Sequence, residues 1–556
     1  MNLLRSTSSG GTAVSNIFIS TIAVGFLSVG SVQADVQLPA LFTDHTVLQR
    51  GMEVPVWGWA DNGEEVTVQF AGQTKTTKAK DGKWMVKLAP LKGTSIGSVL
   101  TVKGNNTLEV QDVVVGEVWI ASGQSNMQWE MARSANSEKD IAEADSKTLR
   151  LFYVPRVKKD APVTDVDAKW TYSAPETVKG FSAVAYYFGR DVEKAQGVPV
   201  GLIHTSWGGS PAEVWISDDV LAGNSGYKKD IVENYQHANE LYQKEKREAE
   251  VKGVEFTKEA PRGLDWKPSE LYNGMIAPLI PYAFKGAIWY QGESNAGRAH
   301  QYRTLFPDMI KNWRRDWGQG DFPFLFVQLA PWDKNQKRAL AEIAAEPVES
   351  DWAELREAQS LTLEVLPNTG MAVITDLGDK DDIHPTRKEP VGQRLALAAE
   401  FVAYNKKDQL SSGPTYKNVK FKNGKAVVTF NNAGKGLAAG QGAEVIEIAT
   451  FEPDKPVSPN TPDGPLFSSF GSGIEMVFGD GSQLTGFAIA GADKKFHWAD
   501  AKIVGRSIVV SSSEVPKPVA VRYGWADYPI VNLYNSAGLP ASPFRTDGWP
   551  GVTSPK

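Results

Sequence analysis

Short stretches of alternating apolar and polar residues follow one another from residue 35 to about residue 112. The stretches 54–59, 66–70 and 84–88 have the period-two pattern of half-buried strands, and turn sequences such as Asp61-Asn62-Gly63 separate them. Many short strands joined by polar turns are typical of a small β-sandwich. We therefore predict an N-terminal β-sandwich domain over residues 35–112.

From residue 113 the apolar positions form nearly continuous runs instead of alternating. Such runs are typical of strands buried on both faces of a parallel sheet. Helical patterns lie between the runs, and this alternation predicts an α/β domain over residues 113–405 with helices on both faces of the sheet. The runs lie at 113–121, 198–204, 285–290, 322–329 and 371–375, and the helical patterns at 183–194, 302–317 and 351–365.

Two regions depart from this alternation. Residues 236–258 are strongly charged, which predicts a solvated helix within an excursion over residues 218–265. After residue 405 short strand patterns return and predict a second β-rich, sandwich-like domain over residues 406–556, in which Asn423-Gly424 is a strong hairpin signal. Its strand patterns lie at 417–421, 426–430, 484–489, 507–511 and 518–522.

The first 34 residues have the features of a leader. Arg5 is the only charge before Asp35, an apolar run covers residues 17–30, and small or compact residues precede Ala34. This pattern predicts a signal peptide, residues 1–34, and export to the periplasm or the exterior of a bacterium. A retained anchor is the alternative, although the run is shorter than the ~20 residues of a membrane span. No later stretch is apolar enough to cross a bilayer.

Composition narrows the class of protein further. The chain has 556 residues, 42% hydrophobic and 22% charged, with a net charge of -6 and no cysteine. A length of this order indicates two to four domains. The acidic balance argues against a nucleic-acid partner, which usually requires a strongly basic face. Without cysteine, disulfides, thiolate catalysis and Cys-ligated zinc are excluded.

The first buried run leads into the turn Ser122-Gly-Gln-Ser-Asn-Met127. Ligands of open parallel sheets sit beyond the carboxyl ends of the strands, so this turn is a candidate site. Ser125 would lie at the start of a helix near Asn126, where free N–H groups favour negative charge. It is therefore a candidate nucleophile, although Met127 replaces the second glycine of the Gly-x-Ser-x-Gly elbow. A simple helix cap is the alternative role for this serine.

The last buried run ends in an acidic loop that contains His384, one of only six histidines. A serine hydroxyl needs a base to remove its proton, and the base needs a carboxylate to orient it. Asp381, three residues before His384, can supply that carboxylate within one turn. The alternatives are a solvated acidic turn or a cation site, but the loop lacks the glycine and terminal glutamate of a calcium loop.

Acyl transfer also requires hydrogen-bond donors for the oxyanion of the tetrahedral intermediate. The N–H of Ser125 is one candidate. Gly208 and Gly209, which follow the second buried run, offer approachable backbone. Gln291 and Asn295, which follow the third run, offer side-chain donors. Four post-strand loops thus carry a nucleophile, donors and a base with its carboxylate, a combination that turns and caps alone do not explain.

These loops resemble the motif blocks of a known family. The blocks Gly-Gln-Ser-Asn-Met, Trp-Gly-Gly-Ser, Gln-Gly-Glu-Ser-Asn and Asp-Asp-Ile-His-Pro are similar to those of SGNH hydrolases, and more narrowly to the sialate O-acetylesterase branch with its carbohydrate acetylesterase relatives. Residues 271–278 and 539–550 are also similar to that branch, so the resemblance extends over most of the chain after the leader.

The resemblance implies a three-layer α/β/α fold and a Ser-His-Asp triad. By motif position, Ser125 is the nucleophile, His384 the base and Asp381 its carboxylate partner. The oxyanion hole would combine the Ser125 N–H and Gly209 with a third donor. Gln291 is favoured slightly over Asn295 as that donor, because it lies nearer the strand end. Glu293 would contact and position the catalytic residues without touching the substrate, or would simply pair with an arginine.

The expected reaction is hydrolysis of an acetyl ester on a sugar through an acetyl-enzyme, without metal or cofactor. The partner is therefore an O-acetylated carbohydrate, either a sialic acid or a plant hemicellulose such as xyloglucan or xylan. Arg298 and Arg303 lie near the Gln-Gly-Glu-Ser-Asn block and could bind a sialate carboxylate, but surface salt bridges explain them equally well.

Two other classes of function compete with the esterase. A glycosidase would use Glu293 and an aspartate such as Asp381 as its paired carboxylates and would cleave glycosidic bonds, but it leaves Ser125 and His384 without roles. A non-catalytic glycan-binding protein could use some of the 17 tryptophans for stacking on sugars, although aromatic residues are more often part of the core. Binding of glycan without release of acetate would favour it.

Overall fold

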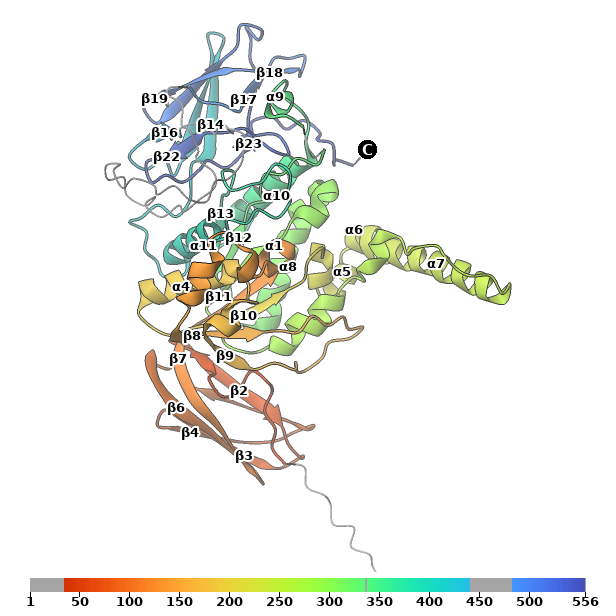
Figure 1. Cartoon of the computed structure of the whole chain (residues 1–556), viewed down its shortest axis with the longest axis vertical. Helices are drawn as coiled ribbons and strands as arrows, with labels where there is room; N and C mark the ends of the chain where they lie inside the picture. Colours follow the sequence, from red (N-terminus) through yellow and green to blue (C-terminus); the bar gives the residue numbers. More distant parts are fainter. Residues whose placement is uncertain (1–34, 336–337, 441–482, 556) are drawn as a thin grey trace, which may run out of the picture.

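The computed structural model describes residues 35–335, 338–440 and 483–555. Three regions follow one another along the long axis of the molecule (Figure 1). Strands of the N-terminal region lie at one end, a large α/β region lies in the middle, and a C-terminal region of short strands lies at the other end. The predicted signal peptide lies outside the described residues.

A mostly parallel sheet forms the centre of the molecule. Its strands lie in the order β13-β12-β11-β7-β10-β8-β9, and all neighbours are parallel except β9, which runs antiparallel to β8 at one edge. The predicted α/β class with a parallel sheet is therefore confirmed. The strands are β7 Thr107–Gly123, β8 Ser146–Tyr153, β9 Trp170–Ser173, β10 Val200–Ser206, β11 Gly286–Tyr290, β12 Phe324–Val327 and β13 Thr369–Ala372.

The continuous apolar runs are explained by cores on both faces of this sheet. Along β7, Trp119 and Ala121 belong to one hydrophobic core, whereas Val118 and Ile120 belong to the other. Helices α4 and α11 contribute to the first core, and α8 and α10 contribute to the second. The bounds are α4 Ala183–Gln196, α8 Ala299–Trp317, α10 Asp351–Val365 and α11 Glu389–Val402.

Strand β7 is much longer than the apolar run that predicts it. Its first half pairs with β6 and with β1 in the N-terminal region, and its second half pairs with β10 and β11 in the central sheet. The predicted boundary between residues 112 and 113 therefore falls inside one continuous strand. The N-terminal strands are β1 Val47–Gln49, β2 Val54–Trp59, β3 Glu65–Phe70, β4 Gln73–Lys78, β5 Lys83–Leu88 and β6 Thr94–Lys103.

The charged excursion contains a long helix that projects from the body of the molecule (Figure 1). This helix, α7 Asn234–Val251, has no buried residue, as its charged sequence predicts. Shorter helical segments connect it to the α/β region on either side. They are α5 Asp218–Gly223, α6 Ser225–Tyr227, η3 Lys228–Glu233 and η4 Arg262–Asp265.

The C-terminal region consists of antiparallel strands around a third hydrophobic core. The predicted hairpin at Asn423-Gly424 joins β14 to β15, and both turn residues have the positive φ that such a turn requires (52° and 72°). The strands are β14 Thr415–Lys422, β15 Lys425–Asn431, β16 Leu437–Ala439, β17 Phe487–Ala490, β18 Phe496–Trp498, β19 Asp500–Val504, β20 Ser507–Ser511, β21 Ala520–Tyr523, β22 Leu533–Asn535 and β23 Phe544–Arg545.

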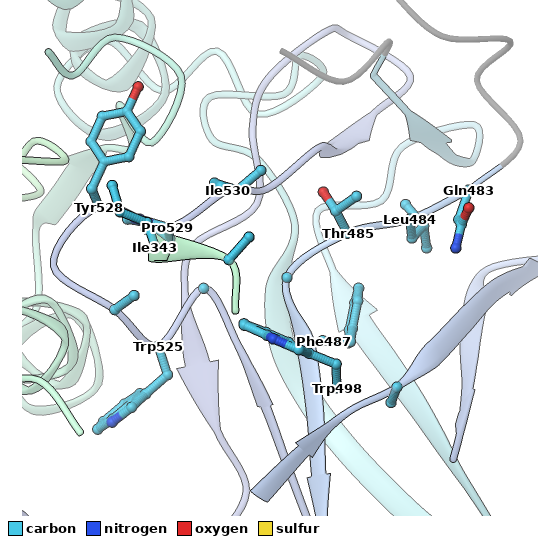
Figure 2. Close-up of a pocket in the computed structure, with 15 residues that line it drawn as sticks. Ile343, Gln483, Leu484, Thr485, Phe487, Trp498, Trp525, Tyr528, Pro529 and Ile530 are labelled. Atoms are coloured by element: carbon cyan, nitrogen blue, oxygen red, sulfur yellow. The ribbon is translucent and has the colours of Figure 1, made fainter. Parts of the chain in front are cut away.

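A cavity of about 240 Å³ opens in this C-terminal region. Phe487, Trp498, Trp525 and Tyr528 line it, together with Ile343 of helix α9 Leu340–Ile343 (Figure 2). None of the candidate site residues lines this cavity. The candidate site residues lie elsewhere, beyond the carboxyl ends of the central strands.

Candidate active site

The turn after β7 sets the position of Ser125. Gly123 has φ of 137°, and a Cβ atom there would lie 2.2 Å from the carbonyl oxygen of Tyr290, so only glycine fits beside β11. The N–H of Gln124 donates to the same carbonyl at 3.0 Å. The chain then enters α1 Ser125–Gln128, with Ser125 as its first helical residue rather than its cap. Ser125 thus stands at the carboxyl edge of the sheet.

His384 reaches Ser125 from the loop after β13. Its Nε2 atom lies 2.9 Å from the Ser125 hydroxyl oxygen, so the structure brings together two residues that are 259 positions apart. The imidazole stacks on the indole of Trp129 with a ring separation of 5.2 Å and an interplanar angle of 20°. Burial lowers the pKa of His384 below its usual 6.5, because the charged imidazolium loses solvation. The histidine is therefore neutral, and able to accept a proton, at neutral pH.

The carboxylate beside His384 is not the one that the sequence spacing predicts. Oδ1 of Asp382 lies 3.4 Å from Nδ1 of His384 and also accepts the backbone N–H of His384 at 2.8 Å. The carboxylate of Asp381 lies 2.5 Å from the ammonium of Lys380 instead. The loop bends before these residues, because Oδ1 of Asp379 accepts the backbone N–H groups of both Asp381 and Asp382. The carboxylate that the structure places beside Nδ1 of His384 is therefore that of Asp382.

Two backbone N–H groups are predicted to bind the oxyanion, those of Ser125 and Gly209. A Cβ on Gly208 would lie 3.2 Å from Cβ of Ser125, so the glycine turn after β10 passes directly beside the nucleophile. The N–H of Gly208 is already donated to the side chain of Gln128 at 2.7 Å. Within the described part of the chain, the N–H groups of Ser125 and Gly209 have no acceptor. Gly209 has φ of 78°, a conformation that favours glycine.

The side-chain amides of Gln291 and Asn295, the predicted third donors, are engaged in hydrogen bonds inside the protein. The side chain of Gln291 is fully buried and donates to Ser210 O at 3.3 Å and to Asn295 Oδ1 at 2.7 Å. Asn295 is 1% exposed and donates to Glu213 at 2.9 Å. Buried amides must be hydrogen-bonded, and these two satisfy one another and their neighbours inside the protein. These bonds join the loop after β11 to Ser210 and Glu213 in the segment after β10.

Glu293 belongs to a buried polar network behind Ser125. Its Oε1 atom accepts a hydrogen bond of 2.7 Å from the Nδ2 atom of Asn126, the residue that follows the nucleophile. The same Nδ2 donates to Ile383 O at 3.0 Å, and Oδ1 of Asn126 accepts from the ammonium of Lys388. One amide therefore ties together the turn of the nucleophile, the loop after β11 and the loop of the histidine.

The charges of this network are strongly desolvated. Burial raises the pKa of Glu293, and burial lowers the pKa of Lys388 to about 7, while Glu293 opposes that second shift. The predicted role of Glu293 as a supporting residue fits this position, but its charged neighbour is a lysine and not an arginine. Asn126 and Lys388 were missed in the sequence, although Asn126 lies in the motif itself and Lys388 lies four residues after His384.

The two arginines suggested as substrate ligands are engaged in salt bridges. Arg298 pairs with Glu213, and Arg303 pairs with Glu357. The salt-bridge alternative therefore describes both of them.

In the described residues, no three histidine, aspartate or glutamate side chains are grouped so that they could hold a metal ion, and no helix is long and apolar enough to span a membrane.

A mostly parallel sheet with a serine and a histidine in contact at its carboxyl edge fits the class of α/β hydrolytic enzymes. The chain belongs to the family described as "Carbohydrate esterase, sialic acid-specific acetylesterase", which it matches over residues 115–256 and 234–400. It is therefore an enzyme that hydrolyses carboxylic ester bonds, and the resemblance seen in the motifs is confirmed.

Individual relatives support the same family. The sialate O-acetylesterase of Rattus norvegicus is 32% identical over 400 residues, which cover 66% of this chain and 72% of the relative. The human sialate O-acetylesterase is 31% identical over 396 residues, 65% of this chain and 69% of the relative. Among solved structures, a carbohydrate acetylesterase from Xanthomonas citri is 36% identical with a TM-score of 0.73, covering 93% of this chain and 100% of that one.

Proposed function

We propose that this carbohydrate acetylesterase removes O-acetyl groups from sugars through an acetyl-enzyme formed on Ser125. The observation that carries the proposal is the contact of 2.9 Å between the Ser125 hydroxyl and Nε2 of a neutral, partly buried His384. A nucleophile within hydrogen-bond distance of a base is the arrangement that acyl transfer requires. The remaining roles belong to Asp382 as the orienting carboxylate and to the N–H groups of Ser125 and Gly209 as oxyanion donors.

The reaction has two steps, formation of the acetyl-enzyme and its hydrolysis. His384 takes the proton of Ser125 as the serine oxygen attacks the acetyl carbonyl, and Asp382 stabilises the imidazolium that forms. The tetrahedral intermediate collapses, the bond to the sugar oxygen breaks, and His384 returns its proton to that oxygen. Water then attacks the acetyl-serine ester with the same base, and acetate and free serine result. No step uses a metal or a cofactor.

Hydrolysis of p-nitrophenyl acetate tests this mechanism. We expect Ser125→Ala to abolish activity without changing the thermal unfolding midpoint, because the serine side chain is small and lies at the first position of the short helix α1. Ser507→Ala, on strand β20 of the C-terminal region, is the matched control and should retain full activity. Near-normal activity of Ser125→Ala would remove this residue from the mechanism.

The competing functions find less support in the geometry. A glycosidase would need Glu293 and Asp381 to face a common substrate, but Glu293 is held behind the nucleophile by Asn126 and Asp381 pairs with Lys380. The identity of the sugar separates the remaining two substrates. Acetate release from O-acetylated sialic acid and from acetylated xyloglucan or xylan, measured side by side, tests whether sialate or hemicellulose is preferred.

Three further aspects belong to the proposal. The helices on both faces of the central sheet support a three-layer α/β/α fold of the SGNH type. The strands before and after it support two flanking β-sandwiches, with strand β7 shared between the N-terminal one and the central domain and with the C-terminal one beginning near residue 406. The leader pattern supports export to the periplasm or the exterior of a bacterium, which N-terminal sequencing of the secreted protein would test through cleavage after Ala34.

A further inference from the structure

The indole of Trp129 lies against the imidazole of the proposed base. Trp129 comes directly after helix α1, whose first residue is Ser125. Its ring is stacked with that of His384 at a separation of 5.2 Å and an angle of 20°, and the tryptophan is only 8% exposed. One short segment therefore carries both the nucleophile and an aromatic surface for the base.

The plane of the His384 imidazole must be set by its neighbours. The χ2 torsion, which rotates a histidine ring, is broad and roughly two-fold, so it does not select one orientation. In a Ser-His-Asp triad, a buried carboxylate holds the ring through Nδ1. Here the carboxylate of Asp382 is 58% exposed and lies 3.4 Å from Nδ1, beyond the roughly 2.7–3.2 Å of an N–H···O hydrogen bond. Asp382 alone therefore holds the plane of the ring weakly.

Trp129 is itself held by several contacts. Its indole N–H donates to the carbonyl oxygen of Arg133 at 3.0 Å, and the guanidinium carbon of Arg133 lies 3.9 Å from the ring centre. The ammonium of Lys388 lies 5.3 Å from the same centre. Its backbone carbonyl accepts the N–H of Ala183, the first residue of helix α4, at 2.9 Å. Because cations are attracted to the face of an indole, these contacts stabilise one orientation of the ring.

We propose that Trp129 is a positioning residue that fixes the plane of the His384 imidazole and so keeps Nε2 directed at the Ser125 hydroxyl, 2.9 Å away. Asp382, at Nδ1, then sets the tautomer. This inference rests on the proposed function, because it assumes that His384 is the base for Ser125. Since Trp129 acts through the base and not on the sugar, its effect belongs to kcat and not to KM.

Two substitutions of Trp129 separate stacking from the filling of space. Trp129→Met fills the site with a flexible chain but offers no flat ring, so kcat for p-nitrophenyl acetate should fall about 10- to 100-fold while KM stays within about 3-fold. Trp129→Phe keeps an aromatic face, and its kcat should stay within about 5-fold of that of the unmodified enzyme. Each kcat is measured well below the thermal unfolding midpoint of the variant, so that a loss of stability does not enter the comparison.

Trp84→Met is the matched control. Trp84, on strand β5 of the N-terminal region, is 3% exposed, and its indole N–H donates to the carbonyl oxygen of Trp59 at 3.2 Å. It therefore resembles Trp129 in burial and in hydrogen bonding but lies away from the candidate active site. Trp84→Met should lower the thermal unfolding midpoint and leave kcat within about 2-fold.

Three results would overturn the positioning role of Trp129. They are an unchanged kcat in Trp129→Met, an equal loss of kcat in Trp129→Met and Trp129→Phe, and a rise in KM at unchanged kcat. Where Trp129→Met does not fold, Trp129→Phe decides alone, and a fall of more than about 10-fold in its kcat contradicts the inference. The proposed function fails separately, through unchanged activity in Ser125→Ala or His384→Ala.

Discussion

The loop that carries His384 presents two adjacent aspartates, and neutralising each in turn distinguishes their roles. Asp382→Asn removes the charge beside Nδ1 but keeps an oxygen that can accept the backbone N–H of His384, so the loop should retain its shape. Asp381→Asn makes the same chemical change, carboxylate to amide, at the neighbouring residue and serves as its control. Only the first change removes a charge that faces the imidazole.

The size of the effect follows from the distance and the exposure of the pair. Two unit charges 3.4 Å apart interact by roughly 1 kcal/mol in bulk water and roughly 5 kcal/mol at an effective dielectric constant of 20. The side chain of Asp382 is 58% exposed, so a value near the lower limit applies, about 1–2 kcal/mol. Because the imidazolium forms only as Ser125 attacks, this energy is lost from the transition state. It corresponds to a fall in kcat of about 5- to 30-fold.

This fall is far smaller than the ~10⁴-fold loss typical of a buried triad aspartate. Steady-state kinetics with p-nitrophenyl acetate at about pH 8, where His384 is neutral in every variant, isolates the effect from changes in protonation. Asp381→Asn should stay within about 2-fold of the unmodified enzyme. The reasoning is refuted if Asp381→Asn loses more activity than Asp382→Asn, which would return the orienting role to the residue that the motif spacing predicts.

Three other predictions follow from the same site. Asn126→Ala leaves the buried charges of Lys388 and Glu293 without their amide, and urea denaturation should show a loss of about 2–4 kcal/mol in the free energy of unfolding; an unchanged midpoint contradicts the network. Gln291→Leu should lower the stability but reduce kcat per folded enzyme less than 10-fold, whereas a loss of ~10²–10³ at normal stability would restore its oxyanion role. On the acidic side of the pH profile, kcat/KM should fall with an apparent pKa below 6.5, because the pKa of His384 is lowered. Lys388→Met should raise this apparent pKa by removing a nearby positive charge. An apparent pKa above 6.5 in the unmodified enzyme rules this out.

Much of the fold could be predicted because it depends on periodicity. Strands buried on both faces must be apolar at nearly every position, so β7, β10, β11, β12 and β13 all stand out as apolar runs in the sequence. Strands β8 and β9 were missed, since both lie toward one edge of the sheet and neither is buried along its whole length. The length of β7 was missed as well, because its first half alternates like an N-terminal strand and only its second half is continuously buried.

The sequence alone also predicted the contact between Ser125 and His384. Ser125 and His384 each follow a buried run, and parallel strands bring their carboxyl ends to one edge, so their meeting is a consequence of topology. Tertiary packing decided the rest. Which of two neighbouring aspartates faces the imidazole depends on the path of a loop, and whether Gln291 can serve an oxyanion depends on neighbours that already occupy its N–H groups. Hydrogen-bond partners and charge desolvation are set by residues distant in sequence, and no local pattern specifies them.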